Sequence, residues 1–360
     1  MKIVHFVGSF GVGGAEEMLV DIANEQCRGC DVTILVLNDS IDAGLRSRLD
    51  PRIAFYSFQR RPGSLSLWPF VRVHLLMNRI QPDIVHLHGC DLKKIFPFRR
   101  SKMVLTIHTT RAPIRKTLPH FDKVFAISEA VAEEVQGRTH WARPKVVQNG
   151  IPVNSIRREK RTNQGIFRIV QVARLAHNHK GQDLLIQAVA KIRDQYPTMD
   201  FSLDLIGDGD SRGFLEGMVR ELGLNKVVTF RGTLPRSQIY EELCQYDLLV
   251  QASRYEGFGL AVVEAMAAGV PVLVSDLEGP REIIEKGRLG FLFQPESIED
   301  CARQIANIHD LRVDDSLAQM IGEARQHVLE KYDVKRTAEE YLAEYRNVLS
   351  LDTMNVASYV

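Results

Sequence analysis

Short runs of apolar, often β-branched residues alternate along the chain with longer stretches in which apolar residues recur at helical spacing. A strand buried on both faces of a parallel sheet is a continuous apolar run, whereas a helix covering that sheet has one apolar face. The alternation predicts an α/β fold, and it occurs twice. The expected strands of the first series are Lys2–Val7, Asp31–Leu37, Ile53–Phe58, Ile84–His88, Met103–His108, Lys123–Ser128 and Val146–Gln148, and those of the second are Phe167–Ala173, Phe201–Ile206, Val227–Phe230, Leu248–Ala252 and Pro271–Ser275.

A polar stretch, Asn154–Gly165, separates the two series and has four Lys or Arg residues and no apolar periodicity. Such a stretch is typical of a linker. We therefore expect two doubly wound, Rossmann-like domains over 1–160 and 161–335, a C-terminal helix over 336–350 that returns to the first domain, and a flexible tail over 351–360. Ligands of open α/β sheets bind beyond the carboxyl ends of the strands, so two such domains facing each other are expected to enclose a cleft.

The composition fits a globular protein of two domains. The chain has 360 residues, of which 45% are hydrophobic, enough to bury a sizeable core. No uninterrupted apolar run approaches the roughly 18 residues that a transmembrane helix requires. The N-terminal apolar stretch is too short for a secretory signal, and the five cysteines show no disulfide spacing. These features predict a cytoplasmic protein with reduced thiols.

The net charge of +1 conceals an asymmetry, because residues 1–160 carry 24 Lys and Arg against 15 Asp and Glu, whereas the remainder carries 22 against 30. The most basic segment of the first half contains Lys93, Lys94, Arg99 and Arg100 interleaved with phenylalanines. This mixture favours an anionic membrane surface as a partner, which predicts peripheral binding at the inner membrane face. A solvated basic face is an equally good interpretation. Nucleic acid is not an expected partner, because no recognised binding motif is present.

A turn rich in glycine follows the expected strand Leu248–Ala252. Its residues Gly257, Phe258, Gly259 and Leu260 lead directly into the next helix. Free amides at a helix start carry partial positive charge, and glycines let a phosphate approach the backbone. The turn therefore predicts a diphosphate-binding site.

Two glutamates flank this turn. Glu264 lies one turn inside the helix, where its carboxylate can accept hydrogen bonds from two ribose hydroxyls. Glu256 lies in the loop ahead of the helix. Two glutamates eight residues apart are weak evidence alone, but the full string from Ser253 to Pro271 closely resembles the signature of the retaining GT-B glycosyltransferases of sequence family four. The resemblance covers nearly the entire chain, although the N-terminal half matches only in short patches, and it implies that Glu256 lies near the transferred sugar.

A basic pair after the strand Phe167–Ala173 resembles a second element of this family. The resemblance implies that Arg174 and Lys180 hold the donor diphosphate. Breaking a sugar–phosphate bond builds negative charge on the leaving diphosphate, and two fixed cations stabilise that charge as the bond lengthens. The pair would replace a metal ion, so neither metal nor cofactor is expected.

The segment after the next strand resembles the base-binding loop of the family and contains Gly207, Asp208 and Gly209. The glycines would let the nucleotide base pack on the backbone, and Gly232 is expected at a second edge of the base pocket. Asp208 and Asp210 have the spacing of a metal-binding pair, but their place in this loop favours the base-binding interpretation.

In the N-terminal half, Gly13 and Gly14 follow the first strand and open a helix. A dinucleotide fingerprint requires a glycine where Glu16 stands, so a Rossmann cofactor site is excluded by the spacing. The segment resembles the Gly-Gly-Ala-Glu element of the family, which implies contact of its amides with the donor phosphate and the acceptor. Helix capping without a ligand is the alternative.

Three histidines lie at the ends of strands in the same half. His86 and His88 share one face of a strand because side chains alternate along it, and they could form a metal pair. Without a third ligand in the sequence pattern, packing or substrate contact is favoured. His108 resembles the family's histidine near the transferred sugar.

The resemblance implies retention of anomeric configuration by front-face attack, in which the departing phosphate oxygen takes the acceptor's proton and the protein supplies geometry and charge stabilisation. The expected donor is a nucleoside-diphosphate-hexose, most simply a UDP-sugar, and the expected acceptor is a glycan or a lipid-linked glycan in cell-envelope polysaccharide synthesis. A sugar-nucleotide 2-epimerase of similar shape is the alternative enzyme, and a non-catalytic binding module is the alternative of another class.

Overall fold

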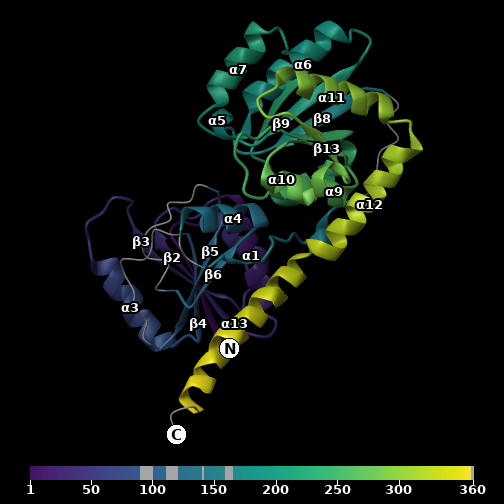
Figure 1. Cartoon of the computed structure of the whole chain (residues 1–360). Coiled ribbons are helices and arrows are strands. Elements are labelled where there is room, and N and C mark those ends of the chain that lie inside the picture. Colours follow the sequence, from purple (N-terminus) through teal and green to yellow (C-terminus); the bar gives the residue numbers. More distant parts are fainter. Residues whose placement is uncertain (90–99, 111–120, 140–141, 159–164, 358–360) are drawn as a thin grey trace. The chain divides into compact units, whose positions relative to one another are not determined.

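The computed structural model describes residues 1–89, 100–110, 121–139, 142–158 and 165–357. The chain forms two compact units (Figure 1). Unit 1 comprises Met1–Ile151 together with Val334–Val360, and unit 2 comprises Pro152–Asp333. Each unit has its own parallel sheet, so the prediction of two doubly wound α/β domains is confirmed.

The sheet of unit 1 has the order β3-β2-β1-β4-β5-β6-β7, and all its neighbouring strands are parallel. The order reverses between β1 and β4, which is the topological switch point where doubly wound folds bind ligands. The strands are β1 (Lys2–Val7), β2 (Asp31–Asn38), β3 (Ala54–Arg60), β4 (Ile84–His88), β5 (Lys102–Ile107), β6 (Lys123–Ala126) and β7 (Lys145–Val146).

Helices cover this sheet because their apolar faces require burial against it. The helices α1 and α13 contact each other and lie over the same face of the sheet (Figure 1). The helices of unit 1 are α1 (Gly14–Gln26), α2 (Ala43–Ser47), α3 (Trp68–Ile80), α4 (Glu129–Arg138) and α13 (Val334–Ala357).

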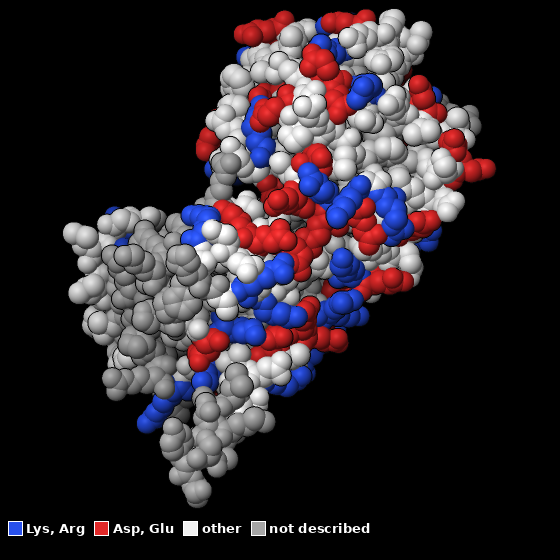
Figure 2. Space-filling model, viewed as in Figure 1, with Lys and Arg blue, Asp and Glu red and all other residues white. Residues whose placement is uncertain are grey.

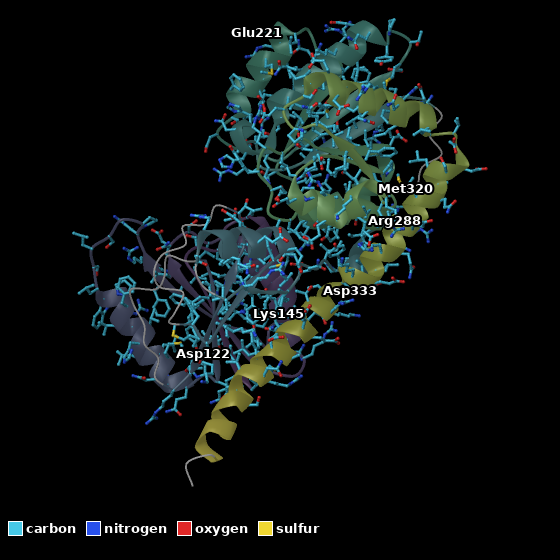
Figure 3. All side chains as sticks on the ribbon, in the orientation of Figure 1. Asp122, Lys145, Glu221, Arg288, Met320 and Asp333 are labelled. Carbon is cyan, nitrogen blue, oxygen red and sulfur yellow. The ribbon has the colours of Figure 1, made fainter. Side chains whose placement is uncertain are left out.

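The C-terminal helix α13 returns to unit 1, as the sequence predicts. The Val334 amide donates to the carbonyl of Ile151 (3.0 Å), and Lys145, labelled in Figure 3, pairs with Glu340 of α13 (3.5 Å). The expected boundary between 160 and 161 was wrong: the units divide after Ile151, because the next residues already pack in unit 2. The helix also continues beyond residue 350, to Ala357.

The sheet of unit 2 has the order β10-β9-β8-β11-β12-β13, again all parallel, with its switch point between β8 and β11. Its sixth strand, β13, was not expected from the sequence. The strands are β8 (Phe167–Val172), β9 (Phe201–Ile206), β10 (Val228–Gly232), β11 (Leu248–Gln251), β12 (Val272–Ser275) and β13 (Phe291–Phe293).

The helices of unit 2 lie on both faces of this sheet (Figure 1). One of them, α12, forms an ion pair with the loop before β13, between Glu323 and Arg288 (2.9 Å). The helices are α5 (His177–Lys180), α6 (Gln182–Gln195), α7 (Arg212–Glu221), α8 (Arg236–Glu242), α9 (Leu260–Ala268), α10 (Glu278–Ile283), α11 (Ile298–Leu311) and α12 (Asp315–Lys331), with 3-10 turns η3 (Val153–Ser155), η4 (Leu243–Gln245) and η5 (Glu285–Gly287).

Within the part of the chain that the structure describes, every helix is too short or too polar to cross a bilayer. On the face of unit 2 that Figure 2 shows, basic and acidic side chains are intermingled rather than segregated by sign. The expected membrane-binding residues Lys93, Lys94 and Arg99 lie outside the described residues, and Arg100 is exposed.

Candidate functional site

The carboxyl ends of β8 and β11 meet at the switch point of unit 2, and a glycine makes their close approach possible. Gly181 has a left-handed backbone (φ +64°), and a Cβ there would lie 1.8 Å from the carbonyl oxygen of Ala252. Only glycine fits this contact. It brings the end of α5, which carries Lys180, against the end of β11.

Lys180 and Glu256 form an ion pair across this switch point, with 2.7 Å between Nζ and Oε2. The same Glu256 oxygen accepts hydrogen bonds from the Gln251 amide (2.6 Å) and, more weakly, from the Ser253 hydroxyl (3.4 Å). The side chains of Lys180 and Glu256 are only 27% and 14% exposed. The half-buried Lys180 cation and the oriented Glu256 carboxylate are therefore adjacent, and both are accessible to a ligand from solvent.

Arg174 also follows β8, but its guanidinium points to solvent. It is 69% exposed and pairs with Asp210, itself 93% exposed, at 3.1 Å. Within the described residues its side chain does not contact Lys180 or Glu256. The two cations that the sequence pairs thus both lie between β8 and α6, with Lys180 held in the site and Arg174 at its rim.

The helix α9 begins at the carboxyl end of β11 with Gly259 as its N-cap in a left-handed conformation (φ +118°). Leu260 is its first residue, so the first amides of the helix point out of its N-terminus without intrahelical partners. The Phe258 side chain is buried and packs edge-to-face on Tyr332, with 5.6 Å between ring centroids. Phe258 therefore anchors the turn, and it is the backbone from Gly257 to Leu260 that can face a ligand.

Glu264 is buried one turn inside α9, with 8% of its surface exposed. Its Oε1 accepts a hydrogen bond from the Tyr240 hydroxyl (3.0 Å) and one from Arg236 (3.3 Å), both on α8. These contacts fix the carboxylate and offset the cost of its burial. Arg236 and Tyr240 were not found from the sequence, since nothing local links α8 to α9.

The loops after β9 and β10 join beside the loop that carries Arg174. The Gly207 amide donates to the carbonyl of Gly232 (2.8 Å). A Cβ at Gly207 would lie 2.1 Å from the Ala173 carbonyl oxygen, and one at Gly209 would lie 2.5 Å from that of Leu175. Both glycines are therefore required for close packing of backbone on backbone.

Asp208, between these glycines, is held by the Gly209 amide and by Arg212 (3.0 Å), and both contacts lower the pKa of its carboxyl. Asp210 faces Arg174. Each carboxylate of this Asp-x-Asp sequence is therefore paired with an arginine.

Two further histidines, for which the sequence indicated no role, help to join these loops. The carbonyls of His177 and His179 accept hydrogen bonds from the Arg254 side chain and amide at 2.7 and 2.8 Å. Arg254 also forms a two-pronged pair with Asp183 (2.7 and 3.0 Å), and His177 Nδ1 contacts the Ser211 hydroxyl (2.8 Å). Through these contacts His177 and His179 connect α5, which ends at Lys180, to the residues that follow β11.

In unit 1, Gly13 caps α1 with extended backbone, and Gly14 is the first helical residue. A Cβ at Gly13 would lie 2.6 Å from the Glu16 carboxylate, and burial raises the pKa of that carboxyl. The turn after β1 is thus an open helix N-terminus, with Gly14 exposed, at the switch point of the first sheet.

The strand-end histidines of unit 1 form a cluster with a member that the sequence did not reveal. His5 on β1 pairs in register with His86 on β4, and ring nitrogens of His5, His86 and His88 lie within 4.8 Å of one another. The expectation that the His86–His88 pair lacks a third histidine was therefore wrong. His108 follows β5, and its Nε2 lies 3.0 Å from His88 Nδ1.

Comparisons with known proteins agree with the motifs. Residues 153–327 match the family model described as glycosyl transferases group 1, and residues 12–155 match that of glycosyltransferase family 4. The uncharacterised glycosyltransferase MJ1607 of Methanocaldococcus jannaschii is 30% identical over 306 residues, covering 75% of this chain and 76% of that protein. The GDP-mannose:cellobiosyl-diphosphopolyprenol alpha-mannosyltransferase of Xanthomonas oryzae is 25% identical, covering 99% and 100%.

Solved structures show the same fold over nearly the whole chain. A glycosyltransferase from Rickettsia africae superposes with a TM-score of 0.80 at 18% identity, covering 97% of this chain and 98% of that one. Anabaena HepE, in complex with UDP and glucose, gives 0.79 at 23% identity, covering 96% and 100%. These likenesses confirm the expected GT-B fold. The chain belongs to the group 1 glycosyltransferases and is a transferase enzyme.

Proposed function

We propose that the protein transfers a hexose from a nucleoside-diphosphate-sugar, with a UDP-sugar as donor, to a glycan or lipid-linked acceptor. The observation that carries the proposal is the Lys180–Glu256 pair at the β8–β11 switch point, next to the glycine turn that opens α9. A cation, a carboxylate and free helix amides at one sheet edge suit a diphosphate and its sugar. The UDP and glucose bound to HepE support the choice of donor.

In this proposal Lys180 and Arg174 stabilise the leaving diphosphate. Surface ion pairs contribute about 0–1 kcal/mol, so Arg174 can exchange its exposed partner Asp210 for a phosphate at little cost. Lys180 is less exposed, and its charge acts more strongly where water is scarce. Two cations in these positions make a metal ion unnecessary for charge neutralisation.

The remaining contacts to the donor come from α9 and the base loop. Glu264, held by Tyr240 and Arg236, has further lone pairs that can accept the ribose hydroxyls. The amides at Gly259 and Leu260 would bind the phosphates. The loop of Gly207, Asp208 and Gly209 with Gly232 would hold the base.

Retention of configuration is proposed to follow front-face attack. A double displacement needs a carboxylate nucleophile beside the anomeric carbon. The Glu256 carboxylate oxygen Oε2 already accepts from Lys180, Gln251 and Ser253, an arrangement that orients a carboxylate rather than freeing it to attack. We therefore assign Glu256 to positioning the sugar.

Unit 1 is proposed to bind the acceptor. Gly13 and Gly14 open α1 at the β1–β4 switch point. His108 follows β5 at the same sheet edge and would contact a sugar hydroxyl. The cellobiosyl-diphosphopolyprenol acceptor of the Xanthomonas oryzae relative supports a lipid-linked substrate and a role in envelope polysaccharide synthesis.

A lipid-linked acceptor calls for a cytoplasmic enzyme that binds the membrane peripherally, and α3 supports this part of the proposal. Its side chains Trp68, Val71 and Leu75 are exposed, and at 100° per residue they fall within one narrow arc of the helix. Arg72 and Arg79 border that arc. No acidic residue occurs between positions 51 and 82, so an anionic lipid surface would meet no repulsion here. The segment with Lys93, Lys94, Arg99 and Arg100 would add charge to the same unit.

The test is incubation with a panel of nucleotide-sugars in EDTA, with and without polyprenyl-diphosphate-linked glycans, followed by measurement of nucleoside diphosphate release. Acceptor-dependent release of UDP with an α-linked product is expected from an α-configured donor. Conversion of the donor to its 2-epimer without acceptor would instead establish the epimerase, which has no support in the family matches. Strict dependence on a divalent metal would contradict the proposal that Lys180 and Arg174 neutralise the charge of the leaving diphosphate.

A further inference from the structure

A chain of hydrogen bonds runs through the core of unit 1 from α1 to the end of β5. Gln26 Oε1 lies 2.8 Å from His5 Nε2, His5 Nδ1 lies 3.0 Å from His88 Nε2, and His88 Nδ1 lies 3.0 Å from His108 Nε2. Gln26 and His5 are fully buried, whereas His88 and His108 are partly exposed at the carboxyl ends of their strands. The chain therefore connects the interior to the face where unit 1 is proposed to bind its ligand.

Each hydrogen bond in this series has one donor and one acceptor, and the first bond determines which nitrogen donates in the others. The structure orients the Gln26 amide with its oxygen, not its nitrogen, on His5. An amide oxygen only accepts, so in this orientation His5 donates from Nε2 and keeps a lone pair on Nδ1. A neutral imidazole has one donor and one acceptor nitrogen, so His88 must then donate from Nε2 to His5. By the same reasoning His108 donates from Nε2 to His88. Burial lowers the pKa of His5 and of His108 to about 4 and holds that of His88 well below its ordinary value, so the rings are neutral at physiological pH.

The last atom of the chain is His108 Nδ1. It is buried, and among the described residues it has no hydrogen-bond partner. Buried polar atoms are nearly always paired, so an unpaired one marks a place where a ligand or water completes the site. The direction of the chain makes this nitrogen an acceptor.

A metal ion is the competing explanation for clustered histidines, but the contacts disfavour it. His86 uses Nδ1 on the Tyr345 hydroxyl (2.6 Å) and Nε2 on the Thr106 hydroxyl (2.7 Å). The nitrogens of His5 and His88 are already used along the chain. An ion would have to break several of these bonds, and the fourth ligand of a tetrahedral site is missing from the described residues.

We propose that Gln26, His5 and His88 are positioning residues that fix His108 as the Nε2–H tautomer, so that His108 Nδ1 accepts a hydrogen bond from a substrate hydroxyl. The identity of that hydroxyl as part of a sugar rests on the proposed function. Orientation of a histidine ring and its tautomer by a partner on the other nitrogen is a general device in catalytic and metal sites. Here the partner acts through two intervening rings.

The direct experiment observes the tautomers of the free, full-length protein labelled with ¹⁵N-histidine, using long-range ¹H–¹⁵N correlation spectra at pH 7. His5, His88 and His108 are all expected to be protonated at Nε2. Gln26→Met removes the acceptor while keeping the side-chain length. We expect protonation at Nδ1 to rise at all three histidines together, because the chain loses its fixed direction.

Two further variants make the result specific. Tyr341→Phe removes a hydroxyl in the same core that contacts Thr106 (3.1 Å) and not the chain, so it should leave the three tautomers unchanged. Gln26→Glu keeps an acceptor at the start of the chain and should preserve the wild-type tautomers even if Gln26→Met does not fold. Protonation at Nδ1 in the wild type, or a change at His5 that does not reach His108, would overturn the proposal.

Turnover separates this inference from the proposed function. If His108 Nδ1 accepts from a hydroxyl, Gln26→Met should lower kcat about tenfold with little change in the KM of the donor, and Gln26→Glu should restore it. A shift of the His108 tautomer with unchanged kcat would contradict the contact between His108 and the substrate, and hence that part of the proposed function, while leaving the tautomer coupling established.

Discussion

The buried histidines of unit 1 should make that unit lose stability between pH 7 and pH 5. Burial lowers the pKa values of His5 and His108 to about 4, from 6.5. A histidine with a lowered pKa in the folded state contributes stability that is present above pH 6.5 and is lost as the pH falls, because only the unfolded chain takes up the proton. At pH 5 each residue should cost about 2 kcal/mol relative to pH 7, and the two together about 4 kcal/mol.

Other groups modify this figure in known directions. His86 and His88 also have lowered pKa values and add to the loss. The half-buried Glu16 has a raised pKa and opposes the loss, since a carboxyl with a raised pKa binds protons more readily in the folded state. Most carboxylates titrate below this window, so the histidines should dominate.

The assay is urea unfolding of the full chain at both pH values, followed by tryptophan fluorescence. The chain has two tryptophans, Trp68 and Trp141, both within the sequence range of unit 1, and the described one, Trp68, begins α3, so the signal reports that unit. A drop of several kcal/mol in the free energy of unfolding is expected, and a His108→Gln variant should show a smaller drop. A difference below about 1 kcal/mol in the wild type would mean that these imidazoles are not buried as neutral rings.

Three other substitutions test separate parts of the account. Gly181→Ala forces a Cβ to within 1.8 Å of the Ala252 carbonyl oxygen and should destabilise unit 2 by more than about 2 kcal/mol in calorimetry; an unchanged melting temperature would refute the close approach. Glu264→Gln should raise the donor KM about tenfold or more if the carboxylate binds ribose hydroxyls, and an unaltered KM would remove it from the donor site. Trp68→Ala with Leu75→Ala should abolish co-sedimentation with vesicles containing anionic lipid, measured against Tyr56→Ala as an exposed aromatic control on β3; equal sedimentation of both variants would exclude α3 as the contact.

The central strands were predictable because they are buried on both faces and their apolar runs are continuous. Lys2–Val7, Ile84–His88 and Phe201–Ile206 have the predicted bounds. The strand Phe291–Phe293 escaped notice, since three residues after a glycine produce no recognisable run. The domain boundary was displaced because the polar segment at Asn154 begins after the chain has already entered unit 2.

In the candidate site too, some residues were predictable from the sequence and others were not. Lys180, Glu256 and Glu264 lie in local patterns of strand, glycine turn and helix, which a sequence displays directly. The partners of Glu264 do not, because they depend on which helices become neighbours: Arg236 and Tyr240 reach this glutamate from α8. Gln251, five residues before Glu256, ends the strand that leads into the Glu256 loop.

His5 illustrates this difference most clearly. Nothing near it in the sequence suggests a polar role, and it stands among apolar residues of the first strand. It meets His86 and His88 only because β1 and β4 are adjacent at the switch point of the sheet. The usual strand order of doubly wound sheets places β1 beside β4. Applied before the search for polar residues, this order would have predicted that His5, His86 and His88 are neighbours.

The most direct test of the account is the rate at which the Lys180→Ala variant releases nucleoside diphosphate from its donor, compared with the wild type under saturating acceptor. Since Lys180 is assigned to the charge that develops on the leaving group, the rate should fall at least about a hundredfold while the variant keeps the wild-type circular dichroism and melting temperature. A rate within about threefold of the wild type, less than about 1 kcal/mol of transition-state stabilisation, would show that Lys180 does not stabilise the leaving diphosphate.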